Sequence, residues 1–237
     1  MKQVKVMGIV NVTPDSFSDG GKYYMPEEAV RRAVKLLAEG ADIIDFGAES
    51  TRPGATALTW QEEWERLEPV LELFFKKSDK GVAQAAISVD TYHPETAERA
   101  LTLGAKMINC VYAKNAPEMI SLCAQTGAEL IVPASVRDPR LEAIPHYLDP
   151  MIGFGTTREE DLSLLKSLPD LAKRGKVAVG VSRKRIVQKL TGEKVLGKNL
   201  GGNLALALWC AEKGVSLLRV HEVKETVQAL QVYAAMS

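Results

Sequence analysis

The residues Gly40-Ala41-Asp42-Ile43-Ile44-Asp45-Phe46-Gly47 contain the repeating unit from which the architecture of the chain can be inferred. Gly40 follows a segment with helical spacing, and glycine readily takes the left-handed backbone that ends a helix. The apolar run after it is too short for a helix and is rich in isoleucine, as buried parallel strands are. The stretch therefore predicts a helix end followed at once by a buried strand.

The same order recurs along the chain. Eight short apolar runs, most of them rich in valine and isoleucine, lie at residues 4–10, 42–47, 85–90, 106–111, 128–134, 146–152, 176–181 and 215–220, the sixth being the weakest. Segments with helical spacing separate them, and in 26–39 and 59–75 the apolar residues fall on one face. Short crossovers force neighbouring strands to be parallel. The pattern predicts a single α/β domain over residues 1–237, a (β/α)8 TIM barrel.

One connection departs from this pattern. Only residues 137–145 join the fifth and sixth strands, too few for a crossover helix of normal length. We therefore expect a shortened or missing helix between strands 5 and 6. The alternative architecture is an open doubly wound sheet, although no Gly-x-Gly-x-x-Gly follows the first strand.

The composition argues against several classes of function. The chain has 237 residues, of which 46% are hydrophobic and 25% charged, so it can bury a core. Thirty basic residues balance thirty acidic ones, which gives no reason to expect nucleic acid or a membrane as partner. No apolar run approaches the roughly 18 residues of a membrane span, and the N-terminal run is interpreted as a strand rather than a signal peptide. Cys110, Cys123 and Cys210 form no Cys-x-x-Cys and are expected to be reduced thiols in the cytoplasm.

Polar residues stand at the carboxyl ends of most predicted strands, which in a barrel meet at one mouth where the chemistry takes place. The carboxylates and amides are Asn11, Asp45, Asp90, Asn109 and Asp149, and the cationic residues after the last two strands are Arg183, Lys184, Arg219 and His221. The cations suit phosphate oxygens, although Arg183-Lys184-Arg185 alone is equally typical of a solvated helix start. A buried carboxylate suits a flat heterocycle with adjacent N–H donors, such as a 2-amino-4-oxo ring. The residues alone predict a barrel enzyme with a heterocycle pocket beside an anion pocket.

Two long motifs resemble the signatures of the dihydropteroate synthase family. They are Met7-Gly8-Ile9-Val10-Asn11-Val12-Thr13-Pro14-Asp15-Ser16-Phe17-Ser18-Asp19-Gly20-Gly21 and Gly40-Ala41-Asp42-Ile43-Ile44-Asp45-Phe46-Gly47-Ala48-Glu49-Ser50-Thr51-Arg52-Pro53-Gly54. Shorter matches follow at 87–91, 108–109, 149–150, 152–155, 182–184 and 219–221. The resemblance covers nearly the whole chain and also implies the pterin-binding barrel fold.

The resemblance implies a transferase of folate biosynthesis that joins 6-hydroxymethyl-7,8-dihydropterin diphosphate to p-aminobenzoate, giving 7,8-dihydropteroate and diphosphate. Carried over by motif, Asp90, Asn109, Asp149 and Lys184 would bind the pterin. Asn11, Arg52, Arg219 and His221 would bind the diphosphate, Asn11 through Mg²⁺, the expected cofactor and metal. Thr51, Arg52, Pro53, Phe154 and Arg185 would frame the aminobenzoate, where sulfonamides compete. The catalytic set would be Asn11, Asp90, Lys184, Arg219 and His221.

The resemblance also suggests a homodimer through helices near the C-terminus. Leu204, Leu206, Leu208 and Trp209 form an apolar face there that is compatible with a dimer. The same face fits burial against the barrel equally well.

Five departures from the family pattern bear on the function. Cys110 stands where the family usually has Asp, and Pro133-Ala134-Ser135 replaces the usual Met-His. The stretch before Asp149 is short. Met151 and Thr156 replace a Gly and a Lys, and Arg185 replaces a Ser. Cys110 is interpreted as a buried apolar residue rather than a nucleophile. Arg185 either forms a salt bridge with the aminobenzoate carboxylate, or fills part of the site, or is an exposed side chain pointing away.

Two other functions compete with the synthase. One is a paralogue that keeps the pterin pocket and has lost or altered the aminobenzoate condensation, which the changes around strands four to six favour. The other is a pterin-binding methyltransferase of the same barrel class, a family that lacks the loop present here at residues 11–17. The intact segments 11–24 and 48–59 favour catalysis over binding alone.

Overall fold

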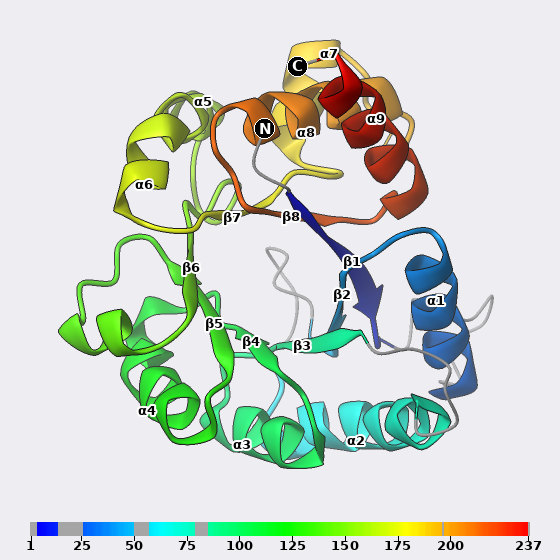
Figure 1. The fold of residues 1–237 in the computed structure, drawn as a ribbon, viewed down its shortest axis with the longest axis vertical. Coiled ribbons are helices and arrows are strands. Elements are labelled where there is room, and N and C mark those ends of the chain that lie inside the picture. Colours follow the sequence, from blue (N-terminus) through cyan, green and yellow to red (C-terminus); the bar gives the residue numbers. More distant parts are fainter. Residues whose placement is uncertain (1–3, 14–25, 50–56, 79–84, 196, 237) are drawn as a thin grey trace.

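The computed structural model describes residues 4–13, 26–49, 57–78, 85–195 and 197–236. In these residues, eight parallel strands form a barrel ringed by helices (Figure 1), which confirms the predicted TIM barrel. The strands are β1 (Lys5–Asn11), β2 (Ile43–Gly47), β3 (Ala86–Asp90), β4 (Met107–Asn109), β5 (Glu129–Pro133), β6 (His146–Asp149), β7 (Ala178–Gly180) and β8 (Leu217–Val220). Every strand overlaps one of the eight runs identified from the sequence.

The strand order closes the sheet on itself. The hydrogen-bonded order is β6-β5-β4-β3-β2-β1-β8-β7. Its two ends are joined by a parallel bridge between Leu148 and Val177, and the Leu148 N–H donates to the carbonyl of Lys176 at 2.9 Å. This closure excludes the open doubly wound alternative.

At least one α-helix follows each strand except β5, and two helices follow each of β6 and β7. The helices are α1 (Pro26–Ala38), α2 (Trp60–Ser78), α3 (Pro94–Leu103), α4 (Ala116–Thr126), α5 (Arg158–Lys166), α6 (Leu168–Arg174), α7 (Arg185–Thr191), α8 (Leu200–Glu212) and α9 (Val223–Ala235), with short 3₁₀ helices η2 (Ala113–Asn115) and η3 (Pro139–Ala143). Between β5 and β6 the connection contains η3 in place of a full α-helix, as the short spacing predicted. Among the described segments, no helix is long and apolar enough to cross a membrane.

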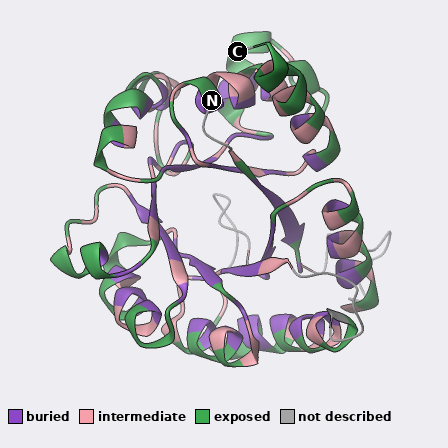
Figure 2. Cartoon of the chain, viewed as in Figure 1, coloured by how far each residue is buried: buried purple, intermediate pink, exposed green. Residues whose placement is uncertain are grey.

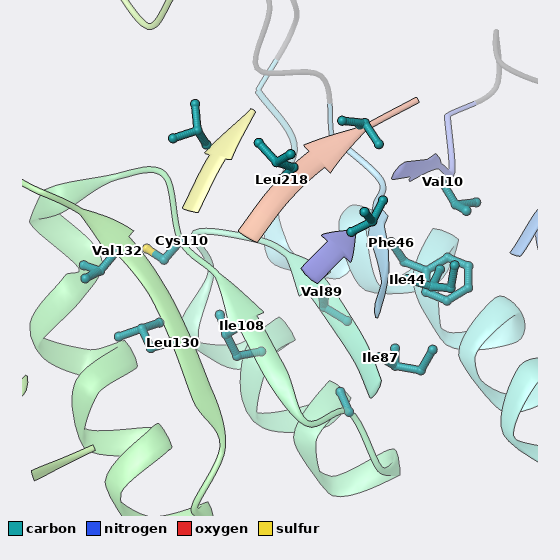
Figure 3. Close-up of a cluster of buried hydrophobic side chains, with 14 of the residues drawn as sticks. Val10, Ile44, Phe46, Ile87, Val89, Ile108, Cys110, Leu130, Val132 and Leu218 are labelled. Carbon is teal, nitrogen blue, oxygen red and sulfur yellow. The ribbon is translucent and has the colours of Figure 1, made fainter. Parts of the chain in front are cut away.

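The main core lies between the outer face of the barrel and the surrounding helices. Figure 2 shows the strands buried and the helices buried on their inner sides and exposed on their outer sides. In α2 the predicted apolar face packs inward, and Phe74 meets Phe46 of β2 edge to face with ring centroids 5.8 Å apart. Valines and isoleucines of β2, β3 and β4 fill the same layer, together with Cys110 (Figure 3). Burial of this continuous apolar layer is the main force that holds the helices on the barrel.

A smaller cluster fills the barrel interior. It consists of Met7, Ile43, Met107, Ile131, Tyr147, Ala178 and Leu217. Because side chains two positions apart on a strand face the same side, the next interior positions toward the carboxyl ends are polar on four of these strands: Asp45, Asn109, Asp149 and Arg219. The two-residue periodicity of the strands therefore places a layer of polar side chains next to the apolar cluster, at the end of the barrel where active sites form.

Candidate active site

Arg219 is the centre of the polar layer. From β8 its guanidinium reaches across the barrel interior, and Nε donates to Asp45 Oδ2 at 2.6 Å while Nη2 donates to Asp90 Oδ2, also at 2.6 Å. Asn109 Nδ2 donates to the same oxygen of Asp45 at 3.3 Å. A fork of fixed donors between two carboxylates holds each group in one orientation. The interior faces of β2, β3, β4 and β8 are thereby joined into one network.

A second group forms where the loop after β6 meets the loop after β7. Asp149 Oδ1 accepts the backbone N–H of Met151 at 2.7 Å. Lys184 Nζ donates to the Ile152 carbonyl at 2.8 Å and lies 4.6 Å from the ring centroid of Phe154. An ammonium over an aromatic face is held by the ring quadrupole. Lys184 thus links the two loops and holds the ring of Phe154, which lines the same cavity as Asp149.

One cavity of about 290 Å³ gathers most of the residues expected from the sequence. Among its lining residues are Asn109, Asp149, Phe154, Lys184, Arg185, Arg219 and His221. Asp90 reaches this group through its ion pair with Arg219. The carboxylate and amide set and the cationic set therefore share one site.

Burial shifts the ionisation of the charged groups in this site. It raises the pKa of the Asp90 carboxyl to about 7, although Arg219 opposes the shift, and it raises the pKa of the Asp149 carboxyl, with the Met151 N–H opposing. Burial lowers the pKa of Lys184, and the charge of Asp149 opposes that change. Burial thus shifts all three groups toward their neutral forms. Neutral groups lose less hydration free energy than charged ones when a polar ring binds among them.

The other expected residues lie at the edge of the site or outside the described part. Asn11 ends β1 and is exposed. His221 follows β8, and its Nδ1 lies 2.7 Å from the hydroxyl of Ser182. Arg185 begins α7 and is exposed, and its side chain makes no hydrogen bond or ion pair with another described residue. Thr51, Arg52 and Pro53 lie outside the described residues.

Sequence reasoning did not assign two buried carboxylates that build the site. Asp45 was counted among the polar residues of the strands but was given no role in the site; a buried acid needs partners, and these are Arg219 and Asn109. Asp161 of α5 is fully buried and carried no signal, because it looks like an ordinary acid in the first turn of a helix. Its Oδ1 accepts from Gly153 N at 2.7 Å and from the Thr156 hydroxyl at 2.5 Å, and it pairs with Arg158. Asp161 therefore shapes the loop that carries Phe154.

The structure shows the surroundings of three residues that depart from the family pattern. Cys110 is buried in the outer core, and burial raises the pKa of its thiol to about 11, which agrees with an apolar role and not with a nucleophile. Met151 has a φ of 62°, a left-handed conformation that glycine adopts without strain. Thr156 donates to Asp161, so its hydroxyl belongs to the loop scaffold.

A (β/α)8 barrel with a polar cavity at the carboxyl ends of its strands is the architecture of an enzyme for a small polar substrate. A family model described as "Pterin binding enzyme" matches residues 7–147 and 144–221. The dihydropteroate synthase of Neisseria meningitidis serogroup C is 38% identical over 267 residues, which cover 98% of this chain and 92% of that protein.

Solved structures give the same result. The Xanthomonas albilineans dihydropteroate synthase with 4-aminobenzoic acid superposes with a TM-score of 0.89 at 37% identity, covering 99% of this chain and 93% of that one. The same enzyme in complex with 7,8-dihydropteroate gives a TM-score of 0.85 at 35% identity, covering 99% and 94%. The chain belongs to the pterin binding enzyme family, among the dihydropteroate synthases.

Proposed function

We propose that this protein uses the cavity described above to condense 6-hydroxymethyl-7,8-dihydropterin diphosphate with p-aminobenzoate, giving 7,8-dihydropteroate and diphosphate. The observation that carries the residue assignments is the gathering of Asn109, Asp149, Lys184 and Arg219 around one cavity of about 290 Å³. Solved relatives contain 4-aminobenzoic acid and 7,8-dihydropteroate, the second substrate and the product of this reaction.

In our assignment the pterin lies in the inner part of the cavity. Asp149 accepts N–H groups of the 2-amino-4-oxo ring, because its Oδ1 is already fixed by the Met151 N–H and its second oxygen can serve a ligand. Asn109 and Lys184 supply an amide and an ammonium to the rest of the ring edge. Asp90 acts near the ring through Arg219, which it holds at 2.6 Å.

The diphosphate lies toward the mouth, beside Arg219 and His221. Arg52 would join them, although it is outside the described residues. Asn11 is the residue that would hold Mg²⁺. An exposed amide oxygen fits this ion, which usually keeps several waters and takes its other ligands from substrate phosphates. Within the described residues, no group of three or more His, Cys, Asp or Glu side chains could hold a metal by itself. Bound there, the ion would supply positive charge to the diphosphate.

The reaction is a displacement at the methylene carbon that joins pterin to diphosphate. The C–O bond breaks, the electron pair leaves with the diphosphate, and the arylamine nitrogen forms the new C–N bond and loses a proton. Arg219 and His221 stabilise the departing charge, and Asp90 and Asp149 stabilise the electron-poor ring. We assign no covalent step to the protein, since the Cys110 thiol is buried outside the barrel interior.

Arg185 is our candidate for binding the aminobenzoate carboxylate. Its exposed guanidinium lines the cavity, and Phe154 on the same side supplies an apolar surface for the benzene ring. Sulfonamides would compete at this position. Arg185→Ala should raise the KM for aminobenzoate about tenfold while leaving the pterin affinity nearly unchanged. Lys189→Ala is the matched control, because Lys189 lies on the same helix, pairs with Glu159 and does not line the cavity. If the wild type and Arg185→Ala have equal KM values for aminobenzoate, Arg185 does not bind the carboxylate and is an exposed side chain pointing away.

One assay tests the activity itself. Purified protein with Mg²⁺ and the pterin diphosphate is supplied with or without p-aminobenzoate, and diphosphate release is measured. We expect release that depends on the amine, together with formation of dihydropteroate. Pterin binding without amine-dependent release would instead identify the paralogue that has lost the condensation.

Asp149→Asn should abolish pterin binding, and retained tight binding would contradict the role given to Asp149.

We also propose a cytoplasmic homodimer. The three cysteines are buried and unpaired, as expected in a reducing compartment. Leu206 and Trp209 of α8 pack on the core, so part of the apolar face noted in the sequence is buried within the subunit. Leu200 remains exposed, as do Leu190 and Val195 of the preceding segment, which leaves apolar surface for a second copy. Sedimentation at micromolar concentration tests this, and a monomer would refute it.

A further inference from the structure

The hydroxyl of Ser182 is bonded to His221 twice. Ser182 follows β7 and His221 follows the adjacent strand β8. Ser182 Oγ accepts the backbone N–H of His221 at 2.9 Å and lies 2.7 Å from Nδ1 of the same residue. Only 8% of Ser182 is exposed, so its hydroxyl has little access to water. The partner available to its hydrogen therefore decides how the two groups share their protons.

A serine hydroxyl has one hydrogen to donate and two lone pairs to accept with. One lone pair is occupied by the His221 N–H. In the described residues the hydroxyl has no acceptor other than Nδ1. If neutral His221 carried its proton on Nδ1, the Ser182 hydrogen would be buried without an acceptor, which is unfavourable. Donation from Ser182 to Nδ1 satisfies both groups and leaves the ring proton on Nε2.

The backbone around His221 is held from two sides. Arg32 of α1 donates from Nη2 to the His221 carbonyl at 3.0 Å. The next residue, Glu222, pairs with Arg183 Nε at 2.8 Å. These contacts hold the backbone at His221 in place, and the Ser182 hydroxyl bonds the ring itself on the wall of the cavity.

We propose that Ser182 is a positioning residue that holds His221 in the Nε2–H tautomer, so that the neutral ring presents an N–H donor to an anionic phosphate group in the cavity. The proposal rests on the proposed function for the identity of that anion, the diphosphate of the substrate. It does not require a charged histidine, because a neutral imidazole with its proton on Nε2 is already a donor.

Nuclear magnetic resonance measures the tautomer of a histidine directly. The chain has three histidines, so long-range ¹H–¹⁵N spectra of the labelled full-length protein are simple to assign, with His221→Asn marking the signal of interest. We expect the Nε2–H pattern for His221 in the wild type at about pH 8. Ser182→Ala should raise the Nδ1–H fraction several-fold, whereas Ser182→Thr, which keeps the hydroxyl, and the exposed-serine control Ser135→Ala should not.

Inorganic pyrophosphate supplies the second readout. At about pH 8 we expect Ser182→Ala to bind pyrophosphate about tenfold more weakly than the wild type by calorimetry, with Ser182→Thr close to the wild type. An Nδ1–H pattern in the wild type would overturn the proposal, even if Ser182→Ala failed to fold. Unchanged spectra or unchanged pyrophosphate affinity in Ser182→Ala would also overturn it. None of these measurements needs turnover, so failure of the synthase assay would refute the proposed function without touching this one.

Discussion

Glu63, on α2, carries a fully buried carboxyl group behind the end of β3. Its Oε2 accepts a hydrogen bond from the Thr91 hydroxyl at 2.6 Å, whereas Oε1 has no hydrogen-bond partner in the described part of the chain. The charged groups near it, Glu49 and Asp90, are also carboxylates. Burial accordingly raises the pKa of Glu63 to about 7 from 4.5. We expect Glu63→Gln to stabilise the protein at neutral and alkaline pH.

The direction of this change in the free energy of unfolding follows from proton linkage. Between pH 4.5 and about 7, the folded protein binds the Glu63 proton more tightly than the unfolded chain does. The free energy of unfolding therefore falls as the pH rises through this interval and is constant with respect to this group outside it. From 4.5 to about 7, at about 1.4 kcal/mol for each pH unit, the full loss is about 3 kcal/mol. Glutamine cannot ionise, and its carbonyl oxygen can still accept from Thr91.

Urea unfolding of the wild type and Glu63→Gln between pH 5 and 8 measures the effect. The variant should match the wild type at the acidic end and be more stable by about 3 kcal/mol at the alkaline end. Glu65→Gln, an exposed position on the same helix, is the matched control and should show no such divergence. Comparing each variant with the wild type removes the contribution of Asp90, whose raised pKa acts in the same direction. A difference that stays constant with pH would refute the reasoning.

Three further predictions concern loops and packing near the site, each measured by urea unfolding. Met151→Gly should stabilise by up to about 1 kcal/mol, because its φ of 62° strains a residue with a Cβ, while Met151→Ala should bring no gain. Gly202→Ala should cost about 1–3 kcal/mol, since a Cβ there would lie 2.6 Å from a valine carbon of α7, whereas Gly201→Ala, with no atom within 4 Å, should stabilise by up to about 1 kcal/mol. Asp161→Asn should destabilise by about 3 kcal/mol, because Arg158 loses its buried counter-charge. A neutral effect at position 161 would mean that the loop after β6 does not depend on that pair.

The fold could be predicted from the sequence because its signals are local. Each strand is a run of apolar residues whose length and β-branched content distinguish it from a helix, and each crossover carries its own helical periodicity. Even the irregularity between β5 and β6 is a matter of chain length, because nine residues cannot hold a normal crossover helix. The strands overlap the predicted runs with boundaries that differ by up to three residues, since hydrogen bonding rather than hydropathy sets where a strand ends.

The site could be predicted only in part, for the opposite reason. Asn109, Asp149 and Arg219 were found because a polar residue directly after an apolar strand is visible in the sequence. The partners of Arg219 were not found. Whether Arg219 pairs with Asp45 and Asp90 or with a bound anion depends on distances across the barrel, which the sequence does not contain. Asp161 lies far from any strand end and acts through the loop it folds. Contacts between distant segments leave no trace in local composition.

The missing helix between β5 and β6 lies next to the candidate pterin site, yet the geometry of the site does not depend on it. Asp149 is placed by its register opposite Pro133 and by the Ala134 N–H, which donates to the Asp149 carbonyl at 2.7 Å. On the outer face, Leu141 of η3 and the adjacent Ile144 are both buried, so the 3₁₀ segment covers part of what a crossover helix would cover. Bonds along the strands fix where a carboxylate stands, while helices outside mainly supply apolar burial. A shortened crossover should therefore reduce stability before it disturbs the chemistry, and amine-dependent diphosphate release with an ordinary KM for the pterin substrate would bear this out.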